Sequence, residues 1–180
     1  MKLDNDILST IPFINTSLMF ARLDDAEFIN ELRSDADLTE HLSRTENNVQ
    51  MQREWLLHYF ERENKGLEYY FVIRNGHNRV GTIRIYNIKN KDFSWGSWIV
   101  SPNAPMKTAL ESMLNIYYLA FEVLNFETAH IDVRNENKKV LSIHQKMGCR
   151  IVSVDGQDTF FELSLSDYNK CKEKFYRILK

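Results

Sequence analysis

DVRNENKKVLSIHQKMGCRIV, at residues 132–152, is the stretch of sequence that decides the fold. It continues a run, Thr128–Arg134, in which apolar and polar residues alternate, and this period predicts a strand. Lys138–Lys146 has the pattern of a short helix, and Gly148 is placed to end it. Cys149–Val154 then returns to a β-rich composition. The stretch therefore predicts a strand, a short helix and a second strand in immediate succession.

Upstream of this stretch, three more β-rich runs follow one another. YYFVIR at 69–74 and VGTIRIY at 80–86 are separated by a polar turn, Asn75-Gly76-His77-Asn78, which predicts an antiparallel hairpin. FSWGSWIV at 93–100 predicts a third strand, which the prolines at 102 and 105 end.

The clearest helix is predicted at 106–124, where one apolar stripe carries Leu110, Met113, Leu114, Tyr117, Phe121 and Leu124. Further strands are expected at 17–23 and 159–165, and further helices at about 24–33, 48–64 and 167–179, with Gly66 after the second of these helices. Residues 1–15 are expected to form an irregular lead-in.

Strands joined by hairpins and interleaved with helices predict an α/β (α+β) fold. We expect a mixed, mostly antiparallel sheet of six to seven strands with helices on both faces. The chain has no internal repeat and no linker rich in Ser, Gly or Pro, so residues 1–180 are expected to form a single domain.

Composition excludes several classes of function. The 180 residues carry a formal net charge of −2, which argues against bulk binding to nucleic acid. The longest aromatic and aliphatic run, Ile116–Phe121, is too short to span a bilayer, and the amino terminus has no apolar signal core. Cys149 and Cys171 are too few for a disulfide framework, which indicates free thiols and a cytoplasmic location.

The order of elements and three local strings resemble the GNAT superfamily of acyl-CoA-dependent N-acetyltransferases, over about Phe20 to Leu165. One string is the hairpin at 69–88, where Val80-Gly81 stands in place of the usual Ile-Gly pair. Another is FSWGSWIVSPNAP at 93–105, leading into a long amphipathic helix. The most specific is the opening stretch, whose motif positions hold Asn137, Val140, His144, Lys146, Met147 and Gly148.

The resemblance implies a GNAT-like fold and acetyl-CoA as co-substrate, with direct transfer to an amine. It implies that the strand before the long helix lines the pantetheine arm through Trp98, Ile99 and Val100. The cofactor pyrophosphate would then sit on the N-terminus of the helix after Pro105.

At that helix the sequence departs from the family. The loop is usually glycine-rich, yet none of the six glycines lies here, and in Ala104–Ala109 only Ala109 fits the pattern. Lys107 and the Thr108 hydroxyl could supply charge and hydrogen bonds instead. The alternative is that CoA binds weakly or not at all.

Two residues of the opening stretch each have two interpretations. Either Asn135 or Asn137 is expected to cap the helix that begins near Lys138, and the resemblance also implies that Asn137 lies beside the pantetheine. In many relatives a tyrosine stands at the position of His144, as the proposed acid for the leaving thiolate. An imidazole could give that proton, or His144 could simply fill the tyrosine's space.

The general base stays open among Asp92, Glu68, His77 and a water chain. The remaining histidines, His41, His58 and His130, lack metal-ligand spacing, and no motif suggests a covalent nucleophile. By the resemblance, residues 34–50 and Trp55 could form a wall of the acceptor cleft.

We therefore expect an acetyl-CoA-dependent N-acetyltransferase that acts on a small-molecule amine. A nucleotide-linked amino sugar for surface polysaccharide is favoured over a protein N-terminus of the ribosomal-protein type, and polyamines, antibiotics and amino acids are further options. A degenerate, non-catalytic GNAT-fold domain is the alternative that the glycine-free loop raises. No nucleic acid or membrane partner is expected, and a homodimer is possible because dimers are common in the superfamily.

Overall fold

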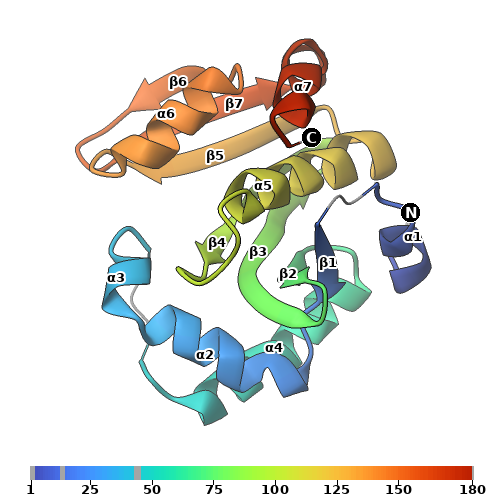
Figure 1. The fold of residues 1–180 in the computed structure, drawn as a ribbon, viewed down its shortest axis with the longest axis vertical. Coiled ribbons are helices and arrows are strands. Elements are labelled where there is room, and N and C mark those ends of the chain that lie inside the picture. The colour runs from blue at the N-terminus through green and yellow to red at the C-terminus, as the bar shows by residue number, and fades with distance from the viewer. Residues whose placement is uncertain (1–2, 13–14, 43–45, 180) are drawn as a thin grey trace.

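The computed structural model describes residues 3–12, 15–42 and 46–179. Seven strands form one sheet in the order β1-β2-β3-β4-β5-β7-β6 (Figure 1). They are β1 (Thr16–Phe20), β2 (Tyr69–Asn75), β3 (Asn78–Lys89), β4 (Asp92–Val100), β5 (Thr128–Arg134), β6 (Arg150–Val154) and β7 (Asp158–Ser164). The β4–β5 pair is parallel and the other five pairs are antiparallel. The predicted mixed, mostly antiparallel sheet is confirmed.

Helices cover both faces of this sheet, as predicted. One face packs against α5 (Thr108–Tyr118), its π-helical continuation η2 (Leu119–Val123), α1 (Asn5–Ser9), α6 (Lys138–Lys146) and α7 (Leu165–Leu179). The other face packs against α2 (Ala26–Ser34) and α4 (Val49–Asn64). Alternate residues of a strand point to opposite faces of the sheet, so β2 contributes side chains to both cores. Phe71 and Ile73 face α5, whereas Tyr70 and Val72 face α2 and α4.

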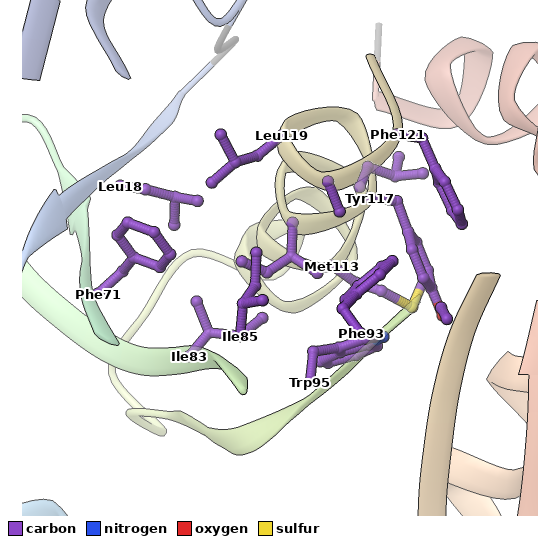
Figure 2. Packing of buried hydrophobic residues seen from close by; sticks show 14 of the residues in the cluster. Leu18, Phe71, Ile83, Ile85, Phe93, Trp95, Met113, Tyr117, Leu119 and Phe121 are labelled. Carbon is purple, nitrogen blue, oxygen red and sulfur yellow. The ribbon is translucent and has the colours of Figure 1, made fainter. Parts of the chain in front are cut away.

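The larger core lies between α5 and strands β1 to β4. Figure 2 shows side chains from the sheet, among them Phe71, Ile85 and Trp95, pointing toward Met113 and Tyr117 of α5. Burying each such side chain contributes about 1.5–3 kcal/mol. The apolar stripe predicted at 106–124 is the one that faces the sheet, so this helix is held in place beside β4.

The structure corrects the sequence prediction at several element ends. The lead-in is not wholly irregular, because Asp4 Oδ1 accepts a hydrogen bond from Ile7 N and starts α1. Strand β1 ends at Phe20 rather than at residue 23, since Leu23–Asp25 form a 3₁₀ turn, η1. A short helix that was not predicted, α3 (Ala36–Thr39), begins at the side-chain cap Asp35. Among the described helices, none is long and apolar enough to cross a membrane.

Strands β4 and β5 diverge after a short paired segment, and this positions the site. Only Asp92–Ser94 of β4 pairs with Thr128–His130 of β5. Beyond this fork the two strands continue without sharing hydrogen bonds, and Figure 1 shows α6 beside β5 and α3 to the left of β4. The fork therefore opens a wedge in the middle of the sheet.

Candidate active site

A groove of about 140 Å³ occupies the wedge between β4 and β5. Its walls are residues 95–98 of β4, residues 131–134 of β5, Asn137, Val140 and His144 at α6, and Asp37, Leu38, Glu40, His41 and Leu42 in and after α3. Beyond Ser94, strand β4 no longer pairs with β5. Backbone N–H and C=O groups on that edge of β4 are therefore available to a bound ligand.

A bulge in β4 shapes the mouth of this groove. The β3–β4 register shifts between Thr82/Ile99 and Arg84/Gly96, so β4 has one residue more than β3 in this interval. Ser97 lies in the bulge with a φ of 48°, a conformation uncommon for a residue other than glycine, and its carbonyl accepts a hydrogen bond from Thr82 Oγ1 at 3.1 Å. Strained bulge residues cluster at functional sites. Ser97 was not among the site residues predicted from the sequence.

The three β4 residues predicted to line the pantetheine arm lie in different surroundings. Trp98 lines the groove, and its Nε1 donates a hydrogen bond to Ser112 Oγ of α5 at 3.1 Å. Ile99 and Val100 pair with Thr82 and Gly81 of β3 and, among the described residues, are not part of the groove wall. Any contact of Ile99 or Val100 with the cofactor would therefore use backbone on the open edge.

The start of α5 offers a helix N-terminus without a side-chain cap among the described residues. Lys107 Nζ donates a hydrogen bond to the carbonyl of Leu179 at 3.1 Å, which ties this turn to α7. Thr108 is buried, and its Oγ1 has no hydrogen-bond partner within the described part of the chain. Ala109 is half-buried behind it. An unsatisfied hydroxyl and a helix dipole suit an anion such as a diphosphate, whereas the Lys107 ammonium is engaged elsewhere.

Asn137 caps α6, as one of its two interpretations predicted. Its Oδ1 accepts a hydrogen bond from Val140 N at 3.2 Å, and Asn137 also lines the groove. Asn135 does not cap the helix, because its Nδ2 donates to the carbonyl of Asp155 and its Oδ1 accepts from Thr159 Oγ1. A contact between Asn137 and the pantetheine stays a prediction.

His144 lies at the back of the groove and is 1% exposed. Its ring packs against Trp95 and Phe161, and its Nδ1 lies 3.8 Å from Cys149 Sγ. Burial lowers the pKa of His144 to about 4 and raises the pKa of the Cys149 thiol to about 12. At neutral pH the imidazole is therefore uncharged, and any hydrogen bond it gives comes from a neutral N–H.

A larger cleft of about 680 Å³ adjoins the groove on the face of the sheet that carries α2 and α4. The two share His41, Leu42, Trp95, Gly96, Ser97, Asp132 and Arg134. His41, Leu42, Glu46, Asn48 and Trp55 form part of its wall. They belong to the segment 34–50 and Trp55 for which a wall of the acceptor cleft was predicted, and that role stays a prediction. Residues 43–45 lie outside the described part.

An arginine and three aromatic rings form the inner wall of this cleft. The indole of Trp55 lies edge-on to Tyr70, and the Arg84 guanidinium lies 5.6 Å from the Trp55 ring and 4.6 Å from the Tyr86 ring. The nearest carboxylate that pairs with Arg84 is Glu68, with NH1 and Oε1 at 4.0 Å. Arg84 Nε is buried and has no hydrogen-bond partner among the described residues. Arg84 is thus a cation with spare hydrogen-bonding capacity.

The outer wall is fixed by a buried asparagine. Asn30 of α2 donates from Nδ2 to Asn47 Oδ1 at 2.7 Å and accepts at Oδ1 from Asn48 N at 3.0 Å. Asn48 in turn caps α4 through Met51 N. These bonds tie the start of α4 to α2, so both helices present fixed side chains to the cleft.

The candidate bases named from sequence do not line either hollow within the described residues. Asp92 lies at the closed end of β4, 3.7 Å from the His130 ring. Glu68 is held by Arg62 at 3.2 Å, and His77 lies in the β2–β3 turn. Asp132, in contrast, lies on the walls of both the groove and the cleft.

The model of a GNAT acetyltransferase domain matches residues 17–150. The chain belongs to the GNAT acetyltransferase family. Members take the acetyl group from acetyl-CoA, so this GNAT protein is an N-acetyltransferase with acetyl-CoA as co-substrate, and the alternative of a non-catalytic domain is set aside. Comparison with curated protein sequences finds no match.

Solved structures agree with this family. One similar structure is apo FdhC, described as a nucleotide-linked sugar GNAT, at 36% identity and a TM-score of 0.83 over 92% of this chain and 96% of that one. A spermidine N-acetyltransferase from Vibrio cholerae, in complex with CoA and spermine, is 16% identical with a TM-score of 0.74 over 86% and 98%. A ribosomal-protein-S5-alanine acetyltransferase from Vibrio fischeri is 15% identical with a TM-score of 0.73 over 87% and 96%. The last two share the fold.

Proposed function

We propose that this GNAT enzyme transfers the acetyl group of acetyl-CoA to the amino group of a nucleotide-linked amino sugar. The observation that carries the proposal is the cleft of about 680 Å³, which sets Arg84 beside the aromatic rings of Trp55 and Tyr86. A guanidinium suits a diphosphate, and aromatic faces suit a nucleobase or a sugar ring. The 36% identity to a nucleotide-linked sugar GNAT supports the same substrate class.

The charges of the cleft do not single out a polyamine. Its wall includes three arginines, Arg33, Arg84 and Arg134, and three acidic residues, Glu46, Asp132 and Asp158, of which Asp158 is paired with Arg134 at 2.9 Å. Within the described residues the wall therefore lacks the excess of negative charge that would attract a polycation. The likeness to the spermidine enzyme therefore reflects the fold. No contact in the described residues favours a protein N-terminus.

In the proposed reaction, the amine attacks the thioester carbonyl at the fork between β4 and β5. Backbone N–H groups of the β4 bulge around Ser97, which lines the groove, would polarise that carbonyl. His144 would act there as a neutral hydrogen-bond donor toward the leaving sulfur, because Nδ1 faces the Cys149 thiol and leaves Nε2 as the remaining ring nitrogen. The thiolate is a tolerable leaving group, so this contribution is expected to be small.

A substrate panel tests the proposal. The purified enzyme is incubated with acetyl-CoA and, separately, with a nucleotide-linked amino sugar, spermidine and a peptide with a free N-terminus, and the release of free CoA is followed. We expect release with the amino sugar, and none with the matched sugar that carries a hydroxyl in place of the amine. Release with the peptide or spermidine alone would reverse the assignment. A cytoplasmic location and a homodimer stay predictions.

A further inference from the structure

The fork between β4 and β5 carries one carboxylate that the sequence analysis passed over. Ser94 pairs with His130 at the end of the shared segment. Two residues further along, Gly96 on β4 and Asp132 on β5 lie on the same face of the sheet as that pair, because alternate strand residues share a face. Ile131 and Val133 point the other way, into the core around α5. Asp132 is therefore the first residue of β5 past the fork that faces the acceptor cleft.

Asp132 differs from the other acidic residues of the two hollows. Asp37 and Glu40 line only the groove, and Glu46 and Asp158 line only the cleft, whereas Asp132 lines both. Asp132 is itself exposed. In the proposed reaction the thioester would lie in the groove and the amine in the cleft, so the carboxylate common to both walls would stand where the two reactants meet.

Tyr86 reaches the same place from β3. A Cβ added to Gly96 would lie 3.1 Å from Tyr86 Oη, so the tyrosine lies across β4 in the space that glycine leaves free. Burial, and then the charge of Asp132, raise the pKa of Tyr86 to about 12, so its hydroxyl stays protonated. Tyr86, Gly96 and Asp132 all line the cleft, so the hydroxyl that lies over Gly96 and the carboxylate of Asp132 face the same hollow.

We propose that Asp132 is the general base of the acetyl transfer and that Tyr86, lying over Gly96, is the positioning residue that holds the acceptor nitrogen beside it. The assignment of a base rests on the proposed transfer to an amine, but not on which amine is used. Within the described residues Asp132 forms no hydrogen bond or ion pair that would hold the fold, whereas Asp158 on the neighbouring strand is paired with Arg134, and this suits a carboxylate kept for chemistry.

The proton transfers balance in this scheme. The amine enters neutral, and its lone pair forms the C–N bond to the thioester carbonyl carbon. Nitrogen becomes strongly acidic as that bond forms, so a carboxylate is a strong enough base to take its proton. The C–S bond then breaks, the electron pair leaves on the CoA sulfur, and the proton on Asp132 passes to that thiolate or to solvent.

Chemical rescue separates a base from a structural residue. Asp132→Ala removes the carboxylate and leaves space, so we expect kcat to fall 100-fold or more, in the range that general-base catalysis contributes. Added sodium formate should restore kcat at least tenfold, because formate can occupy the vacated space. Asp132→Asn should lose a similar factor without rescue, because the amide fills that space. Tyr86→Phe should lose less kcat than either and raise the KM of the acceptor.

Asp92→Ala is the matched control, since Asp92 is an exposed carboxylate at the closed end of the same strand pair. It should keep the wild-type kcat with or without formate. All assays use whichever amine of the substrate panel the wild type acetylates, and acetyl-CoA binding is measured separately by calorimetry. Two results would overturn the assignment of Asp132 as general base. One is a wild-type kcat in Asp132→Asn. The other is no rescue by formate in an Asp132→Ala protein that binds acetyl-CoA normally. Turnover of spermidine instead of an amino sugar would contradict only the proposed substrate class and would leave the assignment of the base intact.

Discussion

The two hollows of the site are built in different ways. The groove between β4 and β5 depends on main-chain features, namely the end of strand pairing after Ser94 and the bulge at Ser97. The start of α5, the predicted pyrophosphate site, is also a main-chain feature, because it has no side-chain cap among the described residues. The larger cleft, proposed to hold the acceptor, depends on side chains that come from α2, α4, β3 and β5. A site built from main-chain groups can be kept with many different side chains, whereas the shape and charge of the cleft change with each substitution of a wall residue. We therefore expect a chain without the family's glycine-rich loop to bind acetyl-CoA through its main chain.

The largest effect is expected at Gly81, which lies against the β4 main chain just past the groove. A Cβ at Gly81 would lie 2.3 Å from the carbonyl oxygen of Ile99, which is backbone and cannot move without opening the β3–β4 ladder. Gly81→Ala should lower the free energy of unfolding by about 3 kcal/mol or more in urea denaturation. Gly156→Ala is the control, because a Cβ there meets no atom within 4 Å. Equal stabilities of the two variants would contradict the role given to Gly81.

The next largest effect is the dependence of stability on pH that the buried imidazole of His144 causes. Burial lowers the folded-state pKa of His144 from 6.5 to about 4, so the unfolded chain binds the extra proton between these two pH values. The wild type should therefore lose up to about 3 kcal/mol of stability as the pH falls from 6.5 to 4, at about 1.4 kcal/mol per pH unit.

His144→Phe tests this effect and the acid role together. Urea denaturation at several pH values should show a smaller loss of stability in acid for this variant, whereas His58→Gln, at an exposed position of α4, should follow the wild type. A neutral imidazole contributes little to leaving-group departure, so His144→Phe should also keep most of its activity at neutral pH. Wild-type acid sensitivity in His144→Phe would show that His144 is not the group that titrates.

The fold was predictable from sequence because its signals act locally. Gly66 and Gly148 adopt φ values of 68° and 88° at the helix ends where glycine was expected, and helix 138–146 has the predicted bounds. The apolar stripe of α5 and the alternation of β5 each reflect the face that is buried. Such patterns need no knowledge of distant residues.

The chemistry of the site was less predictable because it depends on distant neighbours. A serine gives no local sign that it will adopt positive φ, so the bulge at Ser97 could not be read from the sequence. Asp132 alternates with apolar residues as any solvent-facing strand residue does, and only the fork makes its position special. The position of His144 was found from the motif, but its burial and low pKa depend on Trp95 and Phe161, which lie far away in sequence.

Replacing Arg84 of the cleft should raise the KM of the acceptor without changing the KM of acetyl-CoA. Arg84→Gln removes the cation beside Trp55 and Tyr86, so we expect the KM of a nucleotide-linked amino sugar to rise ten- to thirtyfold, or about 1.4–2 kcal/mol. The KM of acetyl-CoA should stay unchanged, because Arg84 does not line the groove. Arg79→Gln, on the same strand but paired with Asp25 at 3.3 Å, is the control. Equal changes in the two KM values would show that Arg84 supports the fold rather than the acceptor.

The smallest effect is expected at the start of α5, where the predicted pyrophosphate site relies on main-chain N–H groups. Lys107 is held by the carbonyl of Leu179, so Lys107→Ala should change the KM of acetyl-CoA threefold or less. Thr108→Val removes the unsatisfied buried hydroxyl at nearly constant volume and should raise that KM about tenfold, as expected for one hydrogen bond to a charged group. Steady-state kinetics with acetyl-CoA as the varied substrate measures both. A larger effect at Lys107 than at Thr108 would mean that the lysine leaves α7 to bind the diphosphate, and that a side chain replaces the missing glycines after all.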